Sequence, residues 1–326
     1  MKSLPQLLAL LLSLTTALQG KPLPTQGQCI VFLGDSNTYA GHYIDLIEAA
    51  ILQQAPELDL TLLNLGLNGE TCSGLSEPDH PYPRPSIHGR LCSVLAKTRP
   101  DIVVVAYGMN DGIYHPQSQT RFNAYKQGIQ AIVRKVHPTG AKLYLLSPPP
   151  FDATPLRSPG KVVPNSAGRF AWFSIYEGYD EVLTDYTNWL LTLQDPRIHQ
   201  ILNIRSPLLE HQALRRQNQP GYLLMHDGVH FNLDGHKTIA NLLLQTWGFC
   251  PKADNLPDGL TDHVRQRQRL LRDAWLTHCG HQRPDVKPGL PPGASPNPGG
   301  RTNGCDPCKA ERRMTYFGTS EHLVPT

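Results

Sequence analysis

After its first twenty residues, the sequence lacks any apolar run long enough to cross a bilayer. It also lacks a strong excess of charge, since the formal net charge is +3, and this gives no reason to expect nucleic acid or an anionic membrane as partner. Its one Cys-x-x-Cys pair, Cys305 and Cys308, has no second pair nearby, whereas a zinc site needs about four ligands. We therefore expect no metal and no cofactor, and interpret the pair as a disulfide or two free thiols.

The N-terminal residues 1–20 are typical of a secretory signal peptide. Lys2 gives a positive start, residues 7–14 are apolar except for Ser13, and residues 15–17 are small. We expect a secreted or periplasmic protein; an uncleaved anchor helix is the alternative.

Seven cysteines accompany this leader, and export permits disulfides. Cys72–Cys92 could close one Pro-rich loop, and Cys250–Cys279 could fasten the C-terminal segment. The odd number leaves at least one cysteine unpaired within the chain.

Short β-rich runs alternate with amphipathic helical patterns over about 220 residues. Strands are expected at 28–33, 60–65, 101–107, 141–147 and 199–204, and helices around 43–51, 122–136, 181–193 and 235–247. This alternation predicts an α/β fold with a central parallel sheet of about five strands wrapped by helices. Ligands bind beyond the carboxyl ends of such strands.

The chain divides by composition into a domain at 28–249, an extension at 250–280 and a Pro/Gly-rich tail at 281–326 that we expect to be extended or disordered. The extension contains a helix at about 260–278, with Arg265, Arg269 and Arg272 along one face. We expect that face to be solvated rather than a polyanion site.

Two long segments interrupt the alternation: 76–89, with four prolines, and 148–178, with four aromatic residues near its end. Such loops are lids and binding walls, or packed surface loops.

Polar or glycine-rich turns follow the first three expected strands. Ser36 lies between a strand and a helix N-terminus, where it could serve as a nucleophile with its own N–H near a developing negative charge, or merely cap the helix. Gly66 could present its backbone N–H to a ligand. Asn110 could donate its side-chain amide to an oxyanion.

A fourth turn, Asp227-Gly228-Val229-His230, precedes the last helix of the domain. Asp and His three residues apart can lie side by side, so that Asp227 orients the imidazole and His230 faces the serine. Together the four turns supply a nucleophile, a base, an orienting acid and three oxyanion donors, the parts needed for acyl transfer.

These four motifs closely resemble the blocks of the SGNH hydrolases, also called the GDSL esterase and lipase superfamily. Gly34-Asp35-Ser36, Gly66, Gly108-Met109-Asn110-Asp111 and Asp227-Gly228-Val229-His230 occur in the family's order, within about 29–249. Asn37 stands where the family's short name has Leu, at a variable position. The resemblance implies a flavodoxin-like three-layer fold, no metal and a reshapeable pocket.

The sequence thus predicts a serine esterase with the triad Ser36, His230 and Asp227 and oxyanion donors from Ser36, Gly66 and Asn110. We expect it to remove short acyl groups, acetyl above all, from carbohydrate, since many secreted relatives do so. A lipase or lysophospholipase, an O-acyltransferase using the same triad, and a silent binding protein are the alternatives. The substrate would be a small-molecule or polymer-borne ester.

Overall fold

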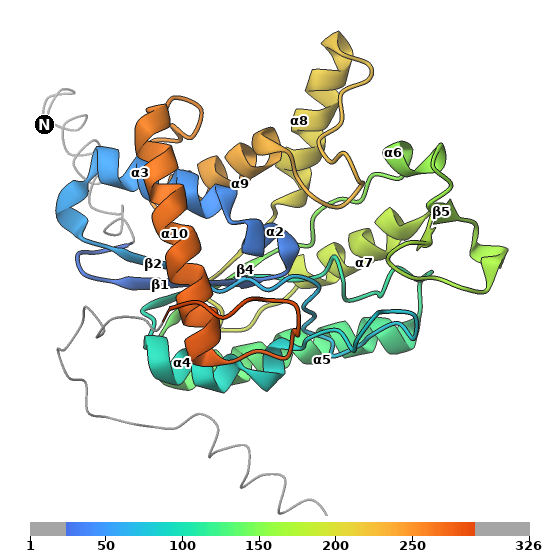
Figure 1. The fold of residues 1–326 in the computed structure, drawn as a ribbon, viewed down its shortest axis with the longest axis horizontal. Helices are drawn as coiled ribbons and strands as arrows, with labels where there is room; N and C mark the ends of the chain where they lie inside the picture. Colours follow the sequence, from blue (N-terminus) through green and yellow to red (C-terminus); the bar gives the residue numbers. More distant parts are fainter. Residues whose placement is uncertain (1–23, 291–326) are drawn as a thin grey trace, which may run out of the picture.

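The computed structural model describes residues 24–290, and its centre is a five-stranded parallel sheet (Figure 1). The strands are β1 (Cys29–Gly34), β2 (Thr61–Asn64), β3 (Ile102–Ala106), β4 (Lys142–Leu146) and β7 (Gln200–Leu202). Their order is β2-β1-β3-β4-β7, and every neighbouring pair is parallel. This is the flavodoxin-like doubly wound order, which confirms the expected fold class.

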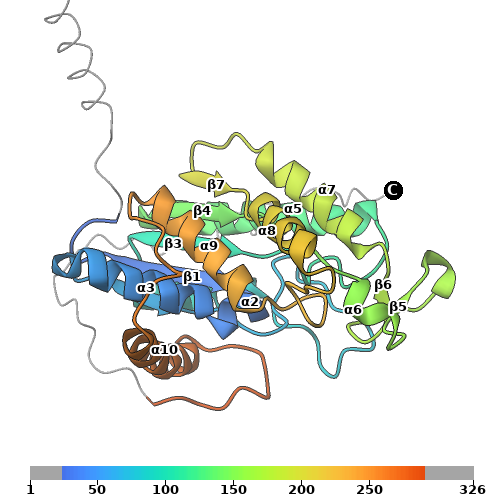
Figure 2. The same cartoon turned by 90° about the horizontal axis from the view of Figure 1, so that it is seen from above.

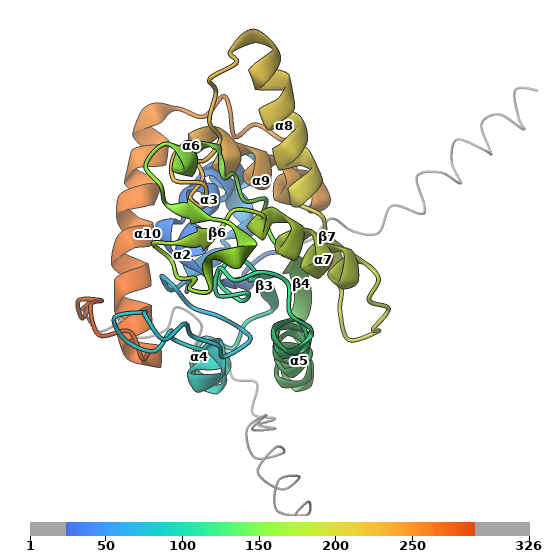
Figure 3. The same cartoon turned by 90° about the vertical axis from the view of Figure 1, so that its right-hand side faces the viewer.

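Two helical layers cover the sheet, and Figure 3 shows α3 and α9 above it and α4 and α5 below. The upper layer contains α3 (His42–Gln54), α8 (Arg205–Asn218) and α9 (Leu233–Thr246); the lower layer contains α4 (Leu91–Thr98), α5 (Gln119–Val136) and α7 (Tyr179–Leu191). The view from above in Figure 2 shows α3 and α9 lying over the sheet.

The position of β1 between the two helical layers explains why its sequence is almost entirely apolar. Ile30 and Phe32 pack toward the upper layer, whereas Val31 and Leu33 pack toward the lower one. Successive side chains of a strand point to opposite faces, so a strand covered on both sides has no polar face.

The shorter elements belong to the connections. They are the helices α2 (Ser36–Ala40) and α6 (Thr154–Arg157), the paired strands β5 (Val162–Val163) and β6 (Ile175–Tyr176), and four 3₁₀ turns at Pro56–Leu58, Ile87–Gly89, His137–Thr139 and Asn165–Ala167.

Helix α10 (Asp258–Cys279) lies beside β2 and α3 rather than standing apart from the domain (Figure 1). Gln268 is buried and donates both to the β2 carbonyl of Leu62, at 3.0 Å, and to the carboxylate of Glu48, at 2.7 Å. A covered edge strand cannot pair with another chain, so α10 protects this side of the sheet.

The expectation of a solvated arginine face on this helix is wrong for Arg272 and holds for Arg269. Arg272 is buried, stacks over the Tyr39 ring at 3.9 Å and donates to the Tyr39 carbonyl at 2.8 Å. Arg265 lies 3.6 Å from the buried carboxylate of Asp45, and only Arg269 is exposed. Helix α10 buries its own apolar residues against the domain, and part of the arginine stripe faces the domain with them.

The two disulfides considered from the sequence are not formed, because Cys72, Cys250 and Cys279 carry free thiols. Cys72 and Cys279 are buried and Cys250 is exposed, and the Cys72 backbone N–H is bound by Asp111. The expected signal peptide, and Cys305 and Cys308, lie outside the described residues. Within 24–290 no helix is long and apolar enough to span a membrane.

The first part of the expected tail is packed. At residues 281–290 the chain turns back along α10, where the Gly289 N–H donates to the Thr277 hydroxyl at 2.7 Å. The remainder of the tail, 291–326, lies outside the described residues.

Candidate active site

A continuous hydrogen-bonded chain joins three of the residues singled out in the sequence. The Nδ1 of His230 lies 2.6 Å from Asp227 Oδ2, and its Nε2 lies 2.8 Å from Ser36 Oγ. With the proton on Nδ1, the imidazole donates to the carboxylate and accepts from the serine hydroxyl. His230 and Asp227 are about half exposed, at 50% and 54% of their side chains, so the chain opens to solvent.

Backbone contacts fix the Asp227 carboxylate. Its Oδ1 accepts from the N–H groups of Val229, at 3.0 Å, and His230, at 2.8 Å. Gly228 allows this tight turn, since its φ is +75° and an added Cβ would lie 2.5 Å from the Asp152 carbonyl. The turn therefore places both groups before any substrate binds.

Ser36 is the first residue of α2, directly after β1. Asp35 caps that helix, because its Oδ1 accepts from the Asn37 N–H at 3.1 Å. The capping role considered for this motif thus belongs to Asp35, which leaves the Ser36 hydroxyl for His230.

Asn37 ties the nucleophile helix to the histidine turn. Its Nδ2 donates to the Val229 carbonyl, and its Oδ1 accepts from the Phe231 N–H, both at 3.1 Å. These two backbone groups flank His230, so one buried amide sets the position of the imidazole relative to Ser36. The sequence marked this residue only as a departure at a variable position.

Hydrogen bonds, burial and nearby charges shift three pKa values at this site. The hydrogen bond to Asp227 raises the pKa of His230 above its usual value, against burial, and the charges of Asp227 and Asp35 add to the rise. Burial raises the pKa of Asp227, but hydrogen bonds from His230 and its backbone outweigh this and leave the pKa well below the usual range. Burial raises the pKa of Asp35 to about 7.

Asn110 lies after β3 with its side chain buried and oriented at both ends. Its Oδ1 accepts from the Tyr114 hydroxyl at 2.9 Å, and its Nδ2 lies 3.3 Å from the Glu70 carbonyl. Tyr114 reaches this position through an unusual backbone, since it and Ile113 have φ of +60° and +47°. Left-handed conformations in such side chains cost energy and occur at functional sites.

Gly66 does not present a free N–H, because that group donates to Asn64 Oδ1 at 3.0 Å. An added Cβ there would lie 2.4 Å from the Tyr39 nitrogen, so the glycine is needed for close packing against α2. The next turn, residues 67–70, begins where the Leu67 N–H donates to the Gly34 carbonyl and ends at the carbonyl that Asn110 contacts. Gly69 therefore lies in the turn that connects the serine loop to Asn110.

The two long loops form one connected wall beyond this turn. Glu77 and Arg84 make a buried bidentate ion pair, at 2.6 and 2.7 Å, and Arg84 also donates to the Gly69 carbonyl at 3.2 Å. The second loop joins the first where the Trp172 N–H donates to Glu77 at 3.3 Å. An exposed ion pair between Arg169 and Asp79, at 2.7 Å, adds a further link.

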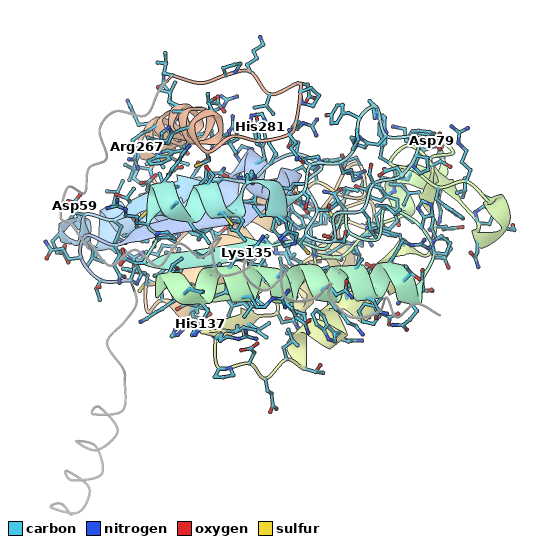
Figure 4. All side chains as sticks on the ribbon, turned by 90° about the horizontal axis from the view of Figure 1, so that it is seen from below. Asp59, Asp79, Lys135, His137, Arg267 and His281 are labelled. Carbon is cyan, nitrogen blue, oxygen red and sulfur yellow. The ribbon has the colours of Figure 1, made fainter. Side chains whose placement is uncertain are left out.

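Figure 4 shows this wall at one end of the molecule, where Asp79 lies opposite Asp59, the residue shortly before β2. The wall is thus at the carboxyl end of the strands, the edge at which ligands bind in this fold. Among residues 24–290, no cluster of three or more His, Cys, Asp or Glu residues could hold a metal ion.

Comparison with known proteins gives one family and several structures. The profile of the GDSL-like lipase/acylhydrolase family matches residues 32–238. A gut microbial diltiazem-metabolizing enzyme is similar with a TM-score of 0.55 and 19% identity, over 71% of this chain and 48% of that one, so this chain spans about half its length. An acetylxylan esterase from Geobacillus stearothermophilus, a catalytic mutant, gives 0.47 and 18%, over 70% and 97%.

A second acetyl xylan esterase has a TM-score of 0.49 and 21% identity, over 67% of this chain and 98% of that one. No curated protein matches the sequence significantly. At 19% identity, the TM-score of 0.55 with the diltiazem-metabolizing enzyme shows a shared fold.

Proposed function

Since the chain belongs to the GDSL-like lipase/acylhydrolase family, we propose that it is a serine esterase with Ser36 as nucleophile, His230 as general base and Asp227 as the group that orients the base. The observation that carries this proposal is the unbroken chain from Asp227 Oδ2 through the imidazole to Ser36 Oγ. Nucleophile and base lie within hydrogen-bond reach, and a third group orients the base, which is the signature of an activated nucleophile.

The reaction proceeds in two halves. His230 Nε2 takes the proton from Ser36 Oγ as that oxygen attacks the ester carbonyl carbon. The resulting tetrahedral intermediate expels the alcohol oxygen, which receives the proton from His230 and leaves an acyl-enzyme. Water then loses a proton to His230 and attacks the acyl carbon, and the proton returns to Ser36 as the acid departs.

For the oxyanion, we propose the N–H of Ser36, the side-chain amide of Asn110 and the N–H of Gly69. Gly69 replaces Gly66 in this set because the Gly66 N–H already has Asn64 as acceptor. Each such donor is worth about 3 kcal/mol of transition-state stabilisation in other enzymes.

We propose a short acyl group on a carbohydrate as substrate, met outside the cytoplasm because of the signal peptide expected at residues 1–20. The half-exposed His230 and Asp227 support an ester carried on a large molecule. Trp172 and Phe173 support it too: they are 50% and 39% exposed, pack edge to face, and stand on the loop that joins the wall. Exposed aromatic faces suit the apolar face of a sugar and an acyl chain equally well.

The test is hydrolysis of p-nitrophenyl esters from acetate to palmitate by the wild-type chain, Ser36→Ala and the control Ser206→Ala, whose serine is exposed on α8 and lies outside both long loops. We expect activity highest on acetate, lost in Ser36→Ala and kept in Ser206→Ala. Release of acetate from acetylated xylan would then support the carbohydrate substrate.

Other outcomes would change the proposal. A long-chain optimum would favour a lipase or lysophospholipase. Transfer of the acyl group to a sugar hydroxyl without hydrolysis would favour an acyltransferase. A folded protein inactive on every ester would contradict an esterase.

A further inference from the structure

The turn at residues 67–70 leaves its central peptide without a partner inside the turn. The Glu70 N–H donates to the Leu67 carbonyl at 3.1 Å, which closes a four-residue β-turn. Gly69 is its third residue, with φ of +72°, the conformation that glycine supplies in a type II turn. The turn's own bond therefore uses neither the Asn68 carbonyl nor the Gly69 N–H, which belong to one peptide unit.

That carbonyl is bound from the C-terminal segment. Arg283 donates from Nη1 to the Asn68 oxygen at 2.6 Å, although the two residues are 215 apart in sequence. Only 15% of the Arg283 side chain is exposed. Its guanidinium also pairs with Asp285 at 2.6 Å and lies 5.3 Å from the Tyr82 ring, so it is held on both sides.

Arg84 donates to the next carbonyl of the same turn, that of Gly69, at 3.2 Å. An added Cβ on Gly69 would lie 3.1 Å from Arg283 and 3.3 Å from Arg84. Two guanidinium groups therefore border the turn on the side of its carbonyls.

Because the Asn68–Gly69 peptide is trans, the bond from Arg283 to its oxygen also determines where its N–H points. The C=O and N–H of one unit point in opposite directions, so a donor that holds the Asn68 oxygen keeps the Gly69 N–H directed away from Arg283. Without that donor the central peptide can rotate, as it does between turn types I and II. A positive group on the carbonyl also polarises the peptide and makes its N–H a stronger donor.

We propose that Arg283 is a positioning residue for the oxyanion site, which holds the Asn68–Gly69 peptide so that the Gly69 N–H stays available to the ester oxygen at Ser36. The inference rests on the proposed function. It also gives a role to the segment after α10, which lies outside the residues that the family profile matches, 32–238.

The contacts of α10 are consistent with this role. Arg272 holds the carbonyl of Tyr39, three residues beyond Ser36. Tyr82, from the first long loop, donates to Asp285 at 3.1 Å. The C-terminal segment thus touches the nucleophile helix, the turn and the wall at once.

The experiment compares kcat and KM for p-nitrophenyl acetate in wild type, Arg283→Ala and Arg283→Lys, with thermal melting of each. We expect Arg283→Ala to lower kcat by about 10-fold to 100-fold with KM nearly unchanged, because an oxyanion donor acts in the transition state. Arg283→Lys can still donate to the Asn68 oxygen, so it should recover part of that loss.

Lys287→Ala is the matched control, a basic and exposed residue of the same segment, and should keep wild-type values. If Arg283→Ala does not fold, Arg283→Met takes its place, since it keeps an apolar stem beside Tyr82 but has no donor. A folded variant with wild-type kcat, or with only KM changed, would overturn the inference while leaving the esterase intact. An inactive wild-type chain would instead overturn the proposed function, and this inference with it.

Discussion

At the scale of single residues, the proton on His230 controls the proposed reaction. Hydrogen bonding to Asp227 raises the pKa of His230 above its usual value, and the charge of Asp35 contributes less. Protonated His230 cannot accept from Ser36, so we expect kcat/KM to fall as pH drops through that raised pKa and to level off above it. The measurement is a pH–rate profile with p-nitrophenyl acetate from about pH 5 to about pH 9.

Asp227 raises the pKa of His230 more than Asp35 does, so variants of the two residues should shift the pH–rate profile by different amounts. Asp227→Asn should move the acid limb to lower pH and lower the rate strongly, by up to about 10⁴. Asp35→Asn should move the limb in the same direction by less, because the Asp35 charge is the smaller cause and Asp35, with a pKa of about 7, is itself partly protonated on this limb. An acid limb that both variants leave in place would rule out this account of His230.

Tyr114 is the residue that orients the Asn110 amide. In Tyr114→Phe the Asn110 oxygen loses its donor, and the amide can rotate its N–H groups away from the oxyanion. We expect kcat for p-nitrophenyl acetate to fall by about 10-fold with little change in KM, and the free energy of unfolding to fall by about 1 kcal/mol.

Tyr125→Phe is the matched control for that prediction. Tyr125 is equally buried, and its hydroxyl has no hydrogen-bond partner among the described residues. Equal losses of kcat in the two variants would point to a general effect of removing a buried hydroxyl.

At the scale of the elements, the site depends on the distance between α2 and the turn before α9. Asn37 is their direct link, through the Val229 carbonyl and the Phe231 N–H. Asn37→Leu leaves both backbone groups without a partner, at a cost of about 1–3 kcal/mol each. We expect a lower melting temperature and a lower kcat, measured by thermal unfolding and p-nitrophenyl acetate hydrolysis.

Asn37→Asp should have a smaller effect on melting temperature and kcat than Asn37→Leu. Its oxygen can still accept from Phe231, but it cannot donate to Val229, so both losses should be intermediate. Wild-type stability and kcat in Asn37→Leu would show that the histidine turn keeps its position without the clamp.

The elements that the sequence predicted are short β-rich runs between turn-forming residues and long amphipathic helices. All five strands were expected within about two residues of their observed ends, because their length and the turn residues on either side indicate strands. Helix α8 was missed, since it buries one apolar residue, Leu208, among polar neighbours. Helix α4 was missed because it is only 8 residues long and follows a Pro-rich loop.

For the site, too, the sequence predicted only part of the arrangement. Motif order predicted that Ser36, Asp227 and His230 would meet, since each follows a strand or precedes a helix at one edge. It did not predict that the Gly66 N–H would be bound by Asn64, because that depends on a side-chain rotamer. It could not predict Arg283, which reaches Asn68 through the packing of α10.

At the scale of the whole molecule, α10 joins the domain that the composition appeared to end at residue 249. It covers the edge of β2, and its last turns pack into the lower core through Trp275, Leu276 and Cys279. If α10 is part of one cooperative unit, its buried residues should stabilise the entire chain, and its exposed residues should contribute almost nothing.

Two leucines of this helix test that statement, because they differ in burial alone: Leu276 is 0% exposed and Leu270 is 63% exposed. Leu276→Ala should lower the free energy of unfolding by about 2–5 kcal/mol, while Leu270→Ala should change it by less than about 0.5 kcal/mol. Urea unfolding followed by circular dichroism, with p-nitrophenyl acetate activity as a second probe, measures both. Coincident transitions in the two probes, shifted together in Leu276→Ala, are expected. A Leu276→Ala variant that unfolds like wild type would mean that α10 is an appendage, and that the edge of β2 is stable without it.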